Sequence, residues 1–225
     1  AAGRKVEVLG PQRGHKAALI RMAEQNAADE AERATTREER QNKLMVLLGN
    51  LLGLPETPHR TESYDISNTG SADIVAAQTV FLDGKPLKRD YRYYKLKDMA
   101  TPDDYASMDQ VLRRRFQRWK DGDDKFTTLP DVILMDGGLG QVRVAVQVLE
   151  DFGLSLPVFG MVKDDRHRTR ALVTPEGREI GIVNDQAVFS LIGQIQEETH
   201  RFAITYHHQH HTKSAMRSVL DGVPG

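Results

Sequence analysis

One aspartate stands where the sequence changes from a short apolar run to a pair of glycines. Residues 131–135 (DVILM) have the length and composition of a buried strand, and Asp136 follows them, before Gly137 and Gly138. Open α/β sheets bind ligands at the carboxyl ends of such strands. A buried carboxylate there costs free energy unless a positive group meets it. Asp136 is therefore a candidate cation ligand, although aspartate before glycine is also a common turn residue.

A second aspartate lies inside another predicted strand. Asp65 belongs to residues 62–68 (ESYDISN), and aspartate is disfavoured in strands, so a purely structural role explains it poorly. Two carboxylates brought within about 5 Å would repel by roughly 3 kcal/mol at an effective dielectric constant near 20. A divalent cation between them would remove that penalty, and oxygen ligands favour Mg²⁺ or Mn²⁺.

The third candidate group is an imidazole on the last predicted helix, over residues 185–206. His200 lies at the margin of an apolar stripe, one turn after Glu197. It could ligate a metal or transfer a proton, and by itself it would be interpreted as an ordinary helix histidine. Together with Asp65 and Asp136 it predicts a catalytic metal site. Asp104 is a possible further ligand, although an acid in the first turn of a helix already has a structural role.

Other polar residues could bind a nucleic-acid backbone. Lys163 ends a predicted strand near the site, Arg92 lies on another strand, and Arg201 follows His200. The residues just after Asp65 offer hydrogen bonds to phosphates, namely Asn68, Thr69 and Ser71. The cations of the helix predicted over residues 101–120 face several directions and indicate a solvated surface: Arg113, Arg114, Arg115, Arg118 and Lys120.

Four histidines lie close together near the end of the chain. A zinc site is not favoured there, because nothing upstream supplies matching ligands. We expect a solvated tail or, when the imidazoles are partly protonated, contacts with phosphates from His207, His208, His210 and His211.

Composition limits the class of protein. The 225 residues suffice for one or two domains, and the absence of cysteine excludes disulfides and thiolate metal sites. No apolar run is long enough to span a bilayer and no signal peptide is visible, so we expect a cytoplasmic protein with no membrane contact. A net charge of −1 means that any DNA-binding surface has to be a local patch. The starting and final residues, AAG and VPG, indicate a fragment of a longer protein.

The elements follow an order that is typical of one mixed α/β fold. A helix is expected from about residue 14 to 52, with residues 28–41 too polar for a core, and residues 53–58 mark a boundary. Three strands over residues 60–68, 74–82 and 89–96 form a meander. A helix, the strand of residues 131–135, a helix, a strand over residues 157–162, a hairpin and the final helix follow. We predict an RNase H-like fold, a mixed central sheet flanked by helices, with an N-terminal helical extension; other mixed α/β folds share parts of this order.

Five motifs carry a resemblance to a known family. YDISN at 64–68, DGKP at 83–86, PDDYASM at 102–108, LMDGGLGQ at 134–141 and ETHRFAIT at 198–205 resemble, in order, the C-terminal endonuclease domain of the UvrC family, the incision subunits of the bacterial UvrABC excinuclease. PQRGHK at 11–16 is similar to the stretch before that domain, and SVLDGVPG at 218–225 to the entry of a tandem helix-hairpin-helix domain. The predicted regions are thus a linker at 1–58, the endonuclease domain at 59–215 and the start of a helix-hairpin-helix region at 216–225.

The resemblance implies a function, and it implies the same three site residues that were named above. It implies an RNase H-like nuclease that makes the 5′ incision at damaged DNA in nucleotide excision repair, with a divalent metal and with UvrB as partner. Its catalytic Asp-Asp-His set falls on Asp65, Asp136 and His200. Two departures are visible: Leu139 stands where members often carry lysine, and residues 207–211 are commonly richer in lysine and arginine.

We therefore expect metal-assisted phosphodiester hydrolysis. The alternatives are a non-catalytic module of the same fold that docks UvrB or DNA, and another RNase H-like nuclease such as a junction resolvase. Without the helix-hairpin-helix domain we expect weak, salt-sensitive DNA binding and poor incision.

Overall fold

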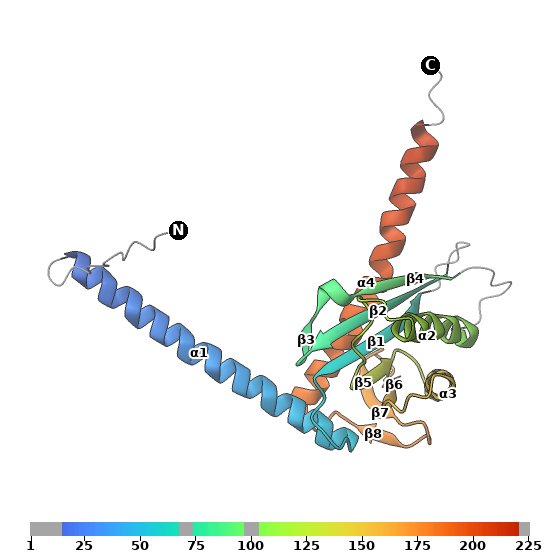
Figure 1. The fold of residues 1–225 in the computed structure, drawn as a ribbon, viewed down its shortest axis with the longest axis horizontal. Coiled ribbons are helices and arrows are strands. Elements are labelled where there is room, and N and C mark those ends of the chain that lie inside the picture. The colour runs from blue at the N-terminus through green and yellow to red at the C-terminus, as the bar shows by residue number, and fades with distance from the viewer. Residues whose placement is uncertain (1–14, 68–73, 97–103, 221–225) are drawn as a thin grey trace, which may run out of the picture. The chain divides into compact units, whose positions relative to one another are not determined.

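An eight-stranded mixed sheet lies at the centre of the described residues that follow α1 (Figure 1). The structure is a computed structural model that describes residues 15–67, 74–96 and 104–220, without the side chains of residues 34 and 206–220. The strand order is β3-β2-β1-β5-β6-β7-β8, and β4 also pairs with β2. The strands are β1 (Arg60–Ser67), β2 (Val75–Leu82), β3 (Lys85–Pro86), β4 (Arg92–Lys95), β5 (Val132–Met135), β6 (Val158–Lys163), β7 (Thr169–Val173) and β8 (Glu179–Gly181).

The pairing combines a meander with parallel strands, as predicted. β1 and β2 are antiparallel, and β2 turns back through Asp83 and Gly84, which both have positive φ as a tight two-residue hairpin turn requires. A short 3₁₀ turn, η1 (Lys88–Asp90), precedes β4, so the third strand begins later than expected. β5 then pairs in parallel with both β1 and β6, which places the meander and the later strands in one sheet.

The two faces of this sheet bury separate hydrophobic clusters. α2 (Asp104–Lys120) and α3 (Leu139–Asp151) pack on one face, and α4 (Gln186–Leu220) and the last turns of α1 (His15–Leu52) pack on the other. Side chains of β5 alternate between them: Ile133 and Met135 join the α2–α3 cluster, and Val132 and Leu134 the α4 cluster. A mixed sheet between helical layers confirms the predicted α/β class.

The helix ends largely follow local signals. α2 ends at Lys120 as expected, and Gly122 has the positive φ typical of a residue after a helix. The predicted start of this helix at Thr101 and Pro102 lies outside the described residues. α4 runs to Leu220, beyond the predicted end near residue 206. Among the helices of the described residues, none combines the length and the hydropathy that crossing a bilayer requires.

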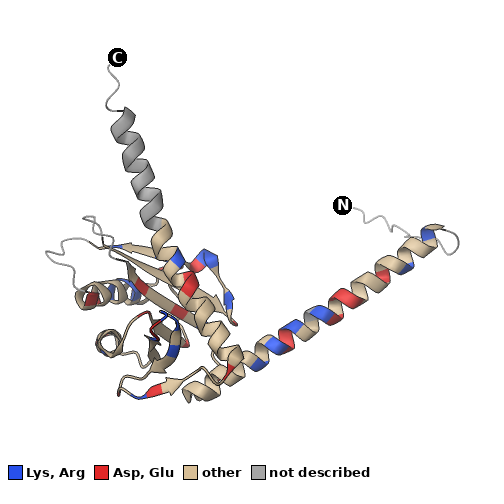
Figure 2. Cartoon of the chain, turned by 180° about the vertical axis from the view of Figure 1, so that it is seen from behind, with Lys and Arg blue, Asp and Glu red and all other residues tan. Residues whose placement is uncertain are grey.

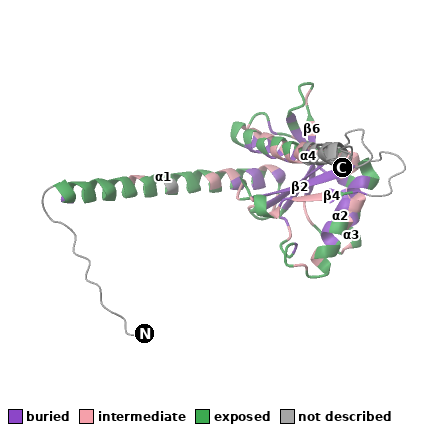
Figure 3. Cartoon of the chain, turned by 90° about the horizontal axis from the view of Figure 1, so that it is seen from above, coloured by how far each residue is buried: buried purple, intermediate pink, exposed green. Residues whose placement is uncertain are grey.

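α1 contains the division between two units of the chain, residues 1–43 and 44–225. Most of its residues up to Lys43 are exposed (Figure 3), and lysines and arginines alternate with acidic residues along it (Figure 2). Leu19 and Met22, two apolar residues of this part of the helix, are 47% and 57% exposed. The last turns differ, because Met45 and Leu48 are buried in the α4 cluster. The predicted domain boundary after residue 58 stays a prediction.

A buried ion network joins β1 to α2. Glu62 and Arg115 are 0% and 1% exposed, and Nη2 of Arg115 donates to Oε1 of Glu62 at 2.8 Å. Tyr64 donates its hydroxyl to the same carboxylate at 2.7 Å, and Arg60 lies 3.4 Å from it. Arg115 also donates to the carbonyl oxygens of Phe126 and Thr128. The predicted solvated surface is thus wrong for Arg115, whose charge is neutralised by a glutamate far away in the sequence.

Candidate active site

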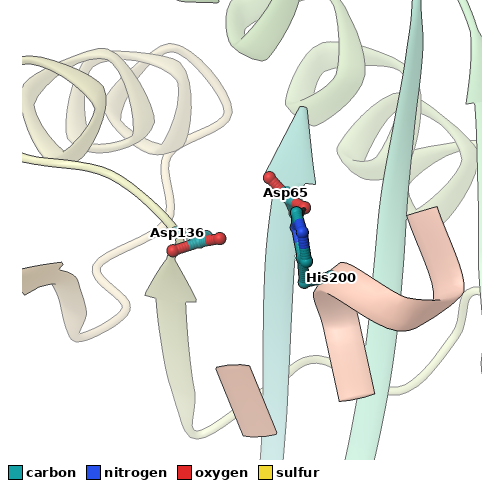
Figure 4. A group of neighbouring side chains, drawn as sticks. All are labelled: Asp65, Asp136 and His200. Atoms are coloured by element: carbon teal, nitrogen blue, oxygen red, sulfur yellow. Dashed lines mark hydrogen bonds and ion pairs between the residues drawn. The ribbon is translucent and has the colours of Figure 1, made fainter. Parts of the chain in front are cut away.

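Asp65 and Asp136 are neighbours because of the parallel pairing of β1 and β5. Tyr64 and Met135 are partners in that register, and the N–H of Asp136 donates to the carbonyl oxygen of Tyr64 at 2.8 Å. Tyr64 and Met135 both face the α2–α3 cluster. Since side chains alternate along strands, the next residue of each strand faces the α4 side at the same level. Figure 4 shows the two carboxylates side by side at the ends of their strands.

Two glycines after Asp136 allow the backbone to turn sharply between β5 and α3. A Cβ atom on Gly137 would overlap the side chain of Gln141, and one on Gly160 would lie 2.5 Å from the carbonyl oxygen of Gly137. A side chain at Gly137 would thus displace Gln141, and one at Gly160 would press on the backbone between β5 and α3. The sequence signal of an aspartate before glycines thus reflects close packing as well as a turn.

α4 holds His200 against β1. Thr199, directly before it, is buried and accepts a hydrogen bond from the hydroxyl of Thr79 on β2, because its own hydroxyl donates to the carbonyl oxygen of Ile195. On the other side of His200, Phe202 stacks on Tyr93 of β4 with ring centroids 3.9 Å apart. His200 itself has a 59% exposed side chain, and its Nδ1 lies 3.1 Å from Oδ2 of Asp65.

The three side chains form a group that could hold a metal ion. One ligand atom from each of Asp65, Asp136 and His200 lies within 4.8 Å of the others. Burial, and then the charge of Asp136, raise the pKa of Asp65 above its ordinary value, while the hydrogen bond from His200 and the charge of Lys163 oppose this rise. The carboxylates therefore carry a cost in the absence of a cation.

Asp136 shows where a cation would be accommodated. Its side chain is 2% exposed, and its Oδ1 accepts no hydrogen bond from the described residues. The Nζ of Lys163 lies 2.8 Å from this oxygen, close enough for an ion pair but outside hydrogen-bond geometry. Two carboxylates and an imidazole, one oxygen being buried without a donor, form a donor set that fits a divalent cation.

The other predicted contacts are scattered. Lys163 is beside the group, as expected. Asp104 is exposed at the start of α2 and is not among the residues that form the group. Arg201 is exposed and forms a two-pronged ion pair with Glu198. Arg92 lies on the α2 side of the sheet, 5.4 Å from the centre of the Phe126 ring. Outside the description are Asn68, Thr69, Ser71 and the side chains of residues 207–211.

Sequence reasoning missed the residues that position the site. Thr199 and Tyr93 fix α4 on either side of His200, and neither stood out, because threonine and tyrosine are ordinary residues of helix and strand. One signal was available: a polar Thr199 at a position of α4 between apolar residues that are themselves buried. A buried hydroxyl needs a partner, and here the partner is on β2.

Comparisons with known proteins find a matching family model, similar sequences and similar solved structures. The family model of the UvrC RNAse H endonuclease domain matches residues 49–204. UvrABC system protein C of Alkaliphilus oremlandii is 41% identical over 239 residues, covering 99% of this chain and 38% of the relative, and that of Lachnospira eligens is 43% identical over 232 residues with the same coverage. A crystal structure of human ENDOV is similar with a TM-score of 0.38 and 15% identity, over 73% of this chain and 90% of the other. The chain spans about 38% of the curated relatives' length. With its family match, its mixed sheet and its paired aspartates, this chain belongs to the family of UvrC RNase H endonuclease domains.

Proposed function

We propose that this chain is a divalent-metal-dependent endonuclease that makes the 5′ incision at damaged DNA in nucleotide excision repair. The observation that carries the proposal is the convergence of Asp65, Asp136 and His200 within 4.8 Å, at the ends of two adjacent parallel strands. The family match supports it, since the matched domain is described as an endonuclease. A docking module would have no need for two costly carboxylates at one position.

Asp65 and Asp136 would hold the cation, Mg²⁺ or Mn²⁺, and His200 would complete the site. When bound, the cation supplies polarisation of the scissile phosphate and activation of an attacking water. The nearly complete burial of Asp136 keeps its carboxylate in a fixed position. The higher exposure of His200 leaves its ring accessible to a substrate that approaches from solvent.

His200 is suited to moving a proton. With Asp65 ionised, the contact between them requires Nδ1 of His200 to carry the proton, because a carboxylate only accepts. This leaves Nε2 with a lone pair for a proton or a ligand bond.

Lys163 would contact the DNA. Its Nζ neutralises Asp136 at 2.8 Å, while 35% of its side chain is exposed. A cation at the aspartates would compete with this ion pair and leave the ammonium group available for a phosphate oxygen. Arg201 and the residues 68, 69 and 71 remain proposed contacts to the backbone, and Asp104 a proposed further ligand.

The wider role is proposed from the relatives. Both relatives described above are UvrABC system protein C. We therefore infer that this chain acts with UvrB on DNA opened around a lesion. We infer that it does so in the cytoplasm.

The test uses an isosteric change at the buried ligand. Asp136→Asn keeps the shape and removes the charge, and Asp121→Asn, at an exposed position after α2, is the matched control. Incision of lesion-containing bubble DNA is measured with UvrB in Mg²⁺ or Mn²⁺, and Mn²⁺ binding by calorimetry. We expect Asp136→Asn to lose both and the control to keep both, with unchanged circular dichroism in each. Incision by Asp136→Asn at the rate of the control would reject the proposal, and cutting of four-way junctions in preference to bubbles would change the substrate.

A further inference from the structure

A second charged pocket lies on the other side of the sheet from the three candidate ligands. It has a volume of about 370 Å³ and is bordered by the start of β1, the η1–β4 segment and the loop after α2. Its lining carries four cationic and two acidic side chains, an excess of two positive charges. They are Arg60, Arg89, Arg92, Lys125, Asp90 and Asp124.

Arg60 lines this pocket although most of its side chain is buried. Its side chain is only 9% exposed, and two of its nitrogens are occupied: Nη1 donates to Asp90 at 2.7 Å, and Nη2 lies 3.4 Å from Glu62. Its Nε is buried and has no acceptor among the described residues. Arg60 lines the pocket, so an anion there would interact favourably with its incompletely satisfied guanidinium.

Arg92 is held rigidly at the same pocket. Its Nη1 donates to the carbonyl oxygens of Arg89 and Tyr91 at 2.7 and 2.8 Å, and its guanidinium lies 5.4 Å from the centre of the Phe126 ring. A guanidinium fixed in this way loses little conformational entropy when it binds a further group. Arg118 lies over the same ring at 5.0 Å, which adds positive potential to this side of the protein.

We propose that this pocket binds a phosphate group. An excess of two positive charges matches the charge of about −1.5 to −2 that a phosphate monoester carries at neutral pH. Guanidinium groups suit phosphate oxygens, and Thr128 adds a polar residue to the lining. Free phosphate, a nucleotide and the phosphorylated end of a DNA strand share this chemistry. The proposal uses neither the three candidate ligands nor Lys163, and it extends beyond the nuclease function.

Lys125 and Asp124 are adjacent and carry opposite charges, so substituting them should change the affinity for phosphate in opposite directions. Lys125→Gln removes a cation from the lining, and Asp124→Asn removes an anion; both residues are exposed, so folding is preserved. The probe is inorganic phosphate, titrated at constant ionic strength against chloride, with the arginine Nε–H signals observed by NMR. We expect a saturable shift of the Arg60 signal, about tenfold weaker binding in Lys125→Gln and several-fold tighter binding in Asp124→Asn.

Matched control variants outside the pocket distinguish a specific phosphate site from nonspecific electrostatic attraction of phosphate to the protein. Lys85→Gln and Asp121→Asn change the same charges at exposed positions, and we expect both to bind phosphate like the unmodified chain. Equal effects of Lys85→Gln and Lys125→Gln, or no shift of Arg60, would overturn the proposal.

The source of the phosphate is resolved by further probes. Adenosine 5′-monophosphate and a short single-stranded DNA are compared, the DNA with and without a 5′-phosphate. Tighter binding of the phosphorylated DNA than of its unphosphorylated form assigns the pocket to a strand end, and equal binding of phosphate and the nucleotide assigns it to the free ion. The same titration in Asp136→Asn separates this proposal from the nuclease, because phosphate binding is expected there even without incision.

Discussion

Glu62 and Asp65 stand on opposite faces of β1 and have opposite surroundings. Glu62, on the α2 side, is fully buried and accepts from Arg115 and Tyr64. Asp65, on the α4 side, is 9% exposed and lies near a second carboxylate, and its hydrogen-bond partner among the described side chains is the imidazole of His200. The same strand thus carries one carboxylate whose charge is matched within the fold and another whose charge is not. The difference is the one expected for a structural role of Glu62 and for the cation site proposed at Asp65.

The largest expected effect separates the two carboxylates by activity. Asp65→Asn should lower the incision rate more than about a thousandfold, because cation binding supplies several kcal/mol of transition-state stabilisation. Glu62→Gln should leave the incision rate of the folded protein within a few-fold while lowering the urea midpoint. Incision of bubble DNA and urea unfolding, measured on both variants, check this. A folded Glu62→Gln protein that does not incise bubble DNA would contradict the purely structural role of Glu62.

The next effect concerns the stability of the matched side. Arg115→Ala leaves Glu62 buried without its main partner, and loss of one member of such a pair typically costs about 3–5 kcal/mol. Arg118→Ala is the control, since its pair with Asp123 is exposed and should contribute less than about 1 kcal/mol. Urea unfolding at neutral pH gives both values. Similar free energies of unfolding for the two variants would show that the network contributes little.

A smaller effect tests how α4 is held on the side of Asp65. Thr199→Val leaves the buried hydroxyl of Thr79 without its acceptor, which should cost about 1–3 kcal/mol. The double variant Thr79→Val with Thr199→Val removes both hydroxyls and should recover part of that loss. Thermal unfolding of the single and double variants measures the coupling. Strictly additive losses would mean that the two hydroxyls do not interact.

The smallest effect is the pH dependence of the unmatched side without metal. The pKa of Asp65 is raised above its ordinary value of 3.8, so the folded state binds this proton more tightly than the unfolded state. This contribution to stability is fully present below the ordinary pKa and is lost as pH rises through the raised pKa. In EDTA, Asp65→Asn should therefore be more stable than the unmodified chain at neutral pH, and the gap should close as pH falls toward about 4. Thermal unfolding across this range checks it; a gap that widens in acid would contradict the assignment, and Asp121→Asn should show none.

Much of the fold followed from local patterns. The strand-like runs of residues 60–68 and 74–82, the hairpin turn after them and the short apolar run before Asp136 predicted these strands. The three site residues also stood out locally: aspartate is disfavoured inside strands such as that of Asp65, Asp136 ends an apolar run, and His200 borders an apolar stripe. The structure brings these three together.

The partners of charged side chains could not be predicted in this way. Arg115 resembles its neighbours Arg113, Arg114 and Arg118 in sequence, and only its position on α2, facing β1, gives it Glu62 as a partner. Arg92 was predicted as a contact to the nucleic-acid backbone, and its sequence neighbours do not show that it lines a pocket on the α2 side of the sheet. Similarly, nothing local shows that the last turns of α1 enter the core while the preceding turns are exposed.

By itself, the sequence determined which residues are in strands, which side chains share a face, and which groups could carry charge to a site. Those properties depend on neighbours along the chain and on a period of two or of 3.6 residues. Only the tertiary structure decided that β5 lies beside β1 with Tyr64 opposite Met135, and this register sets Asp65 beside Asp136 and Glu62 beneath α2. The energy of a charge depends on what surrounds it in space, and contacts between residues far apart in the chain supply those surroundings.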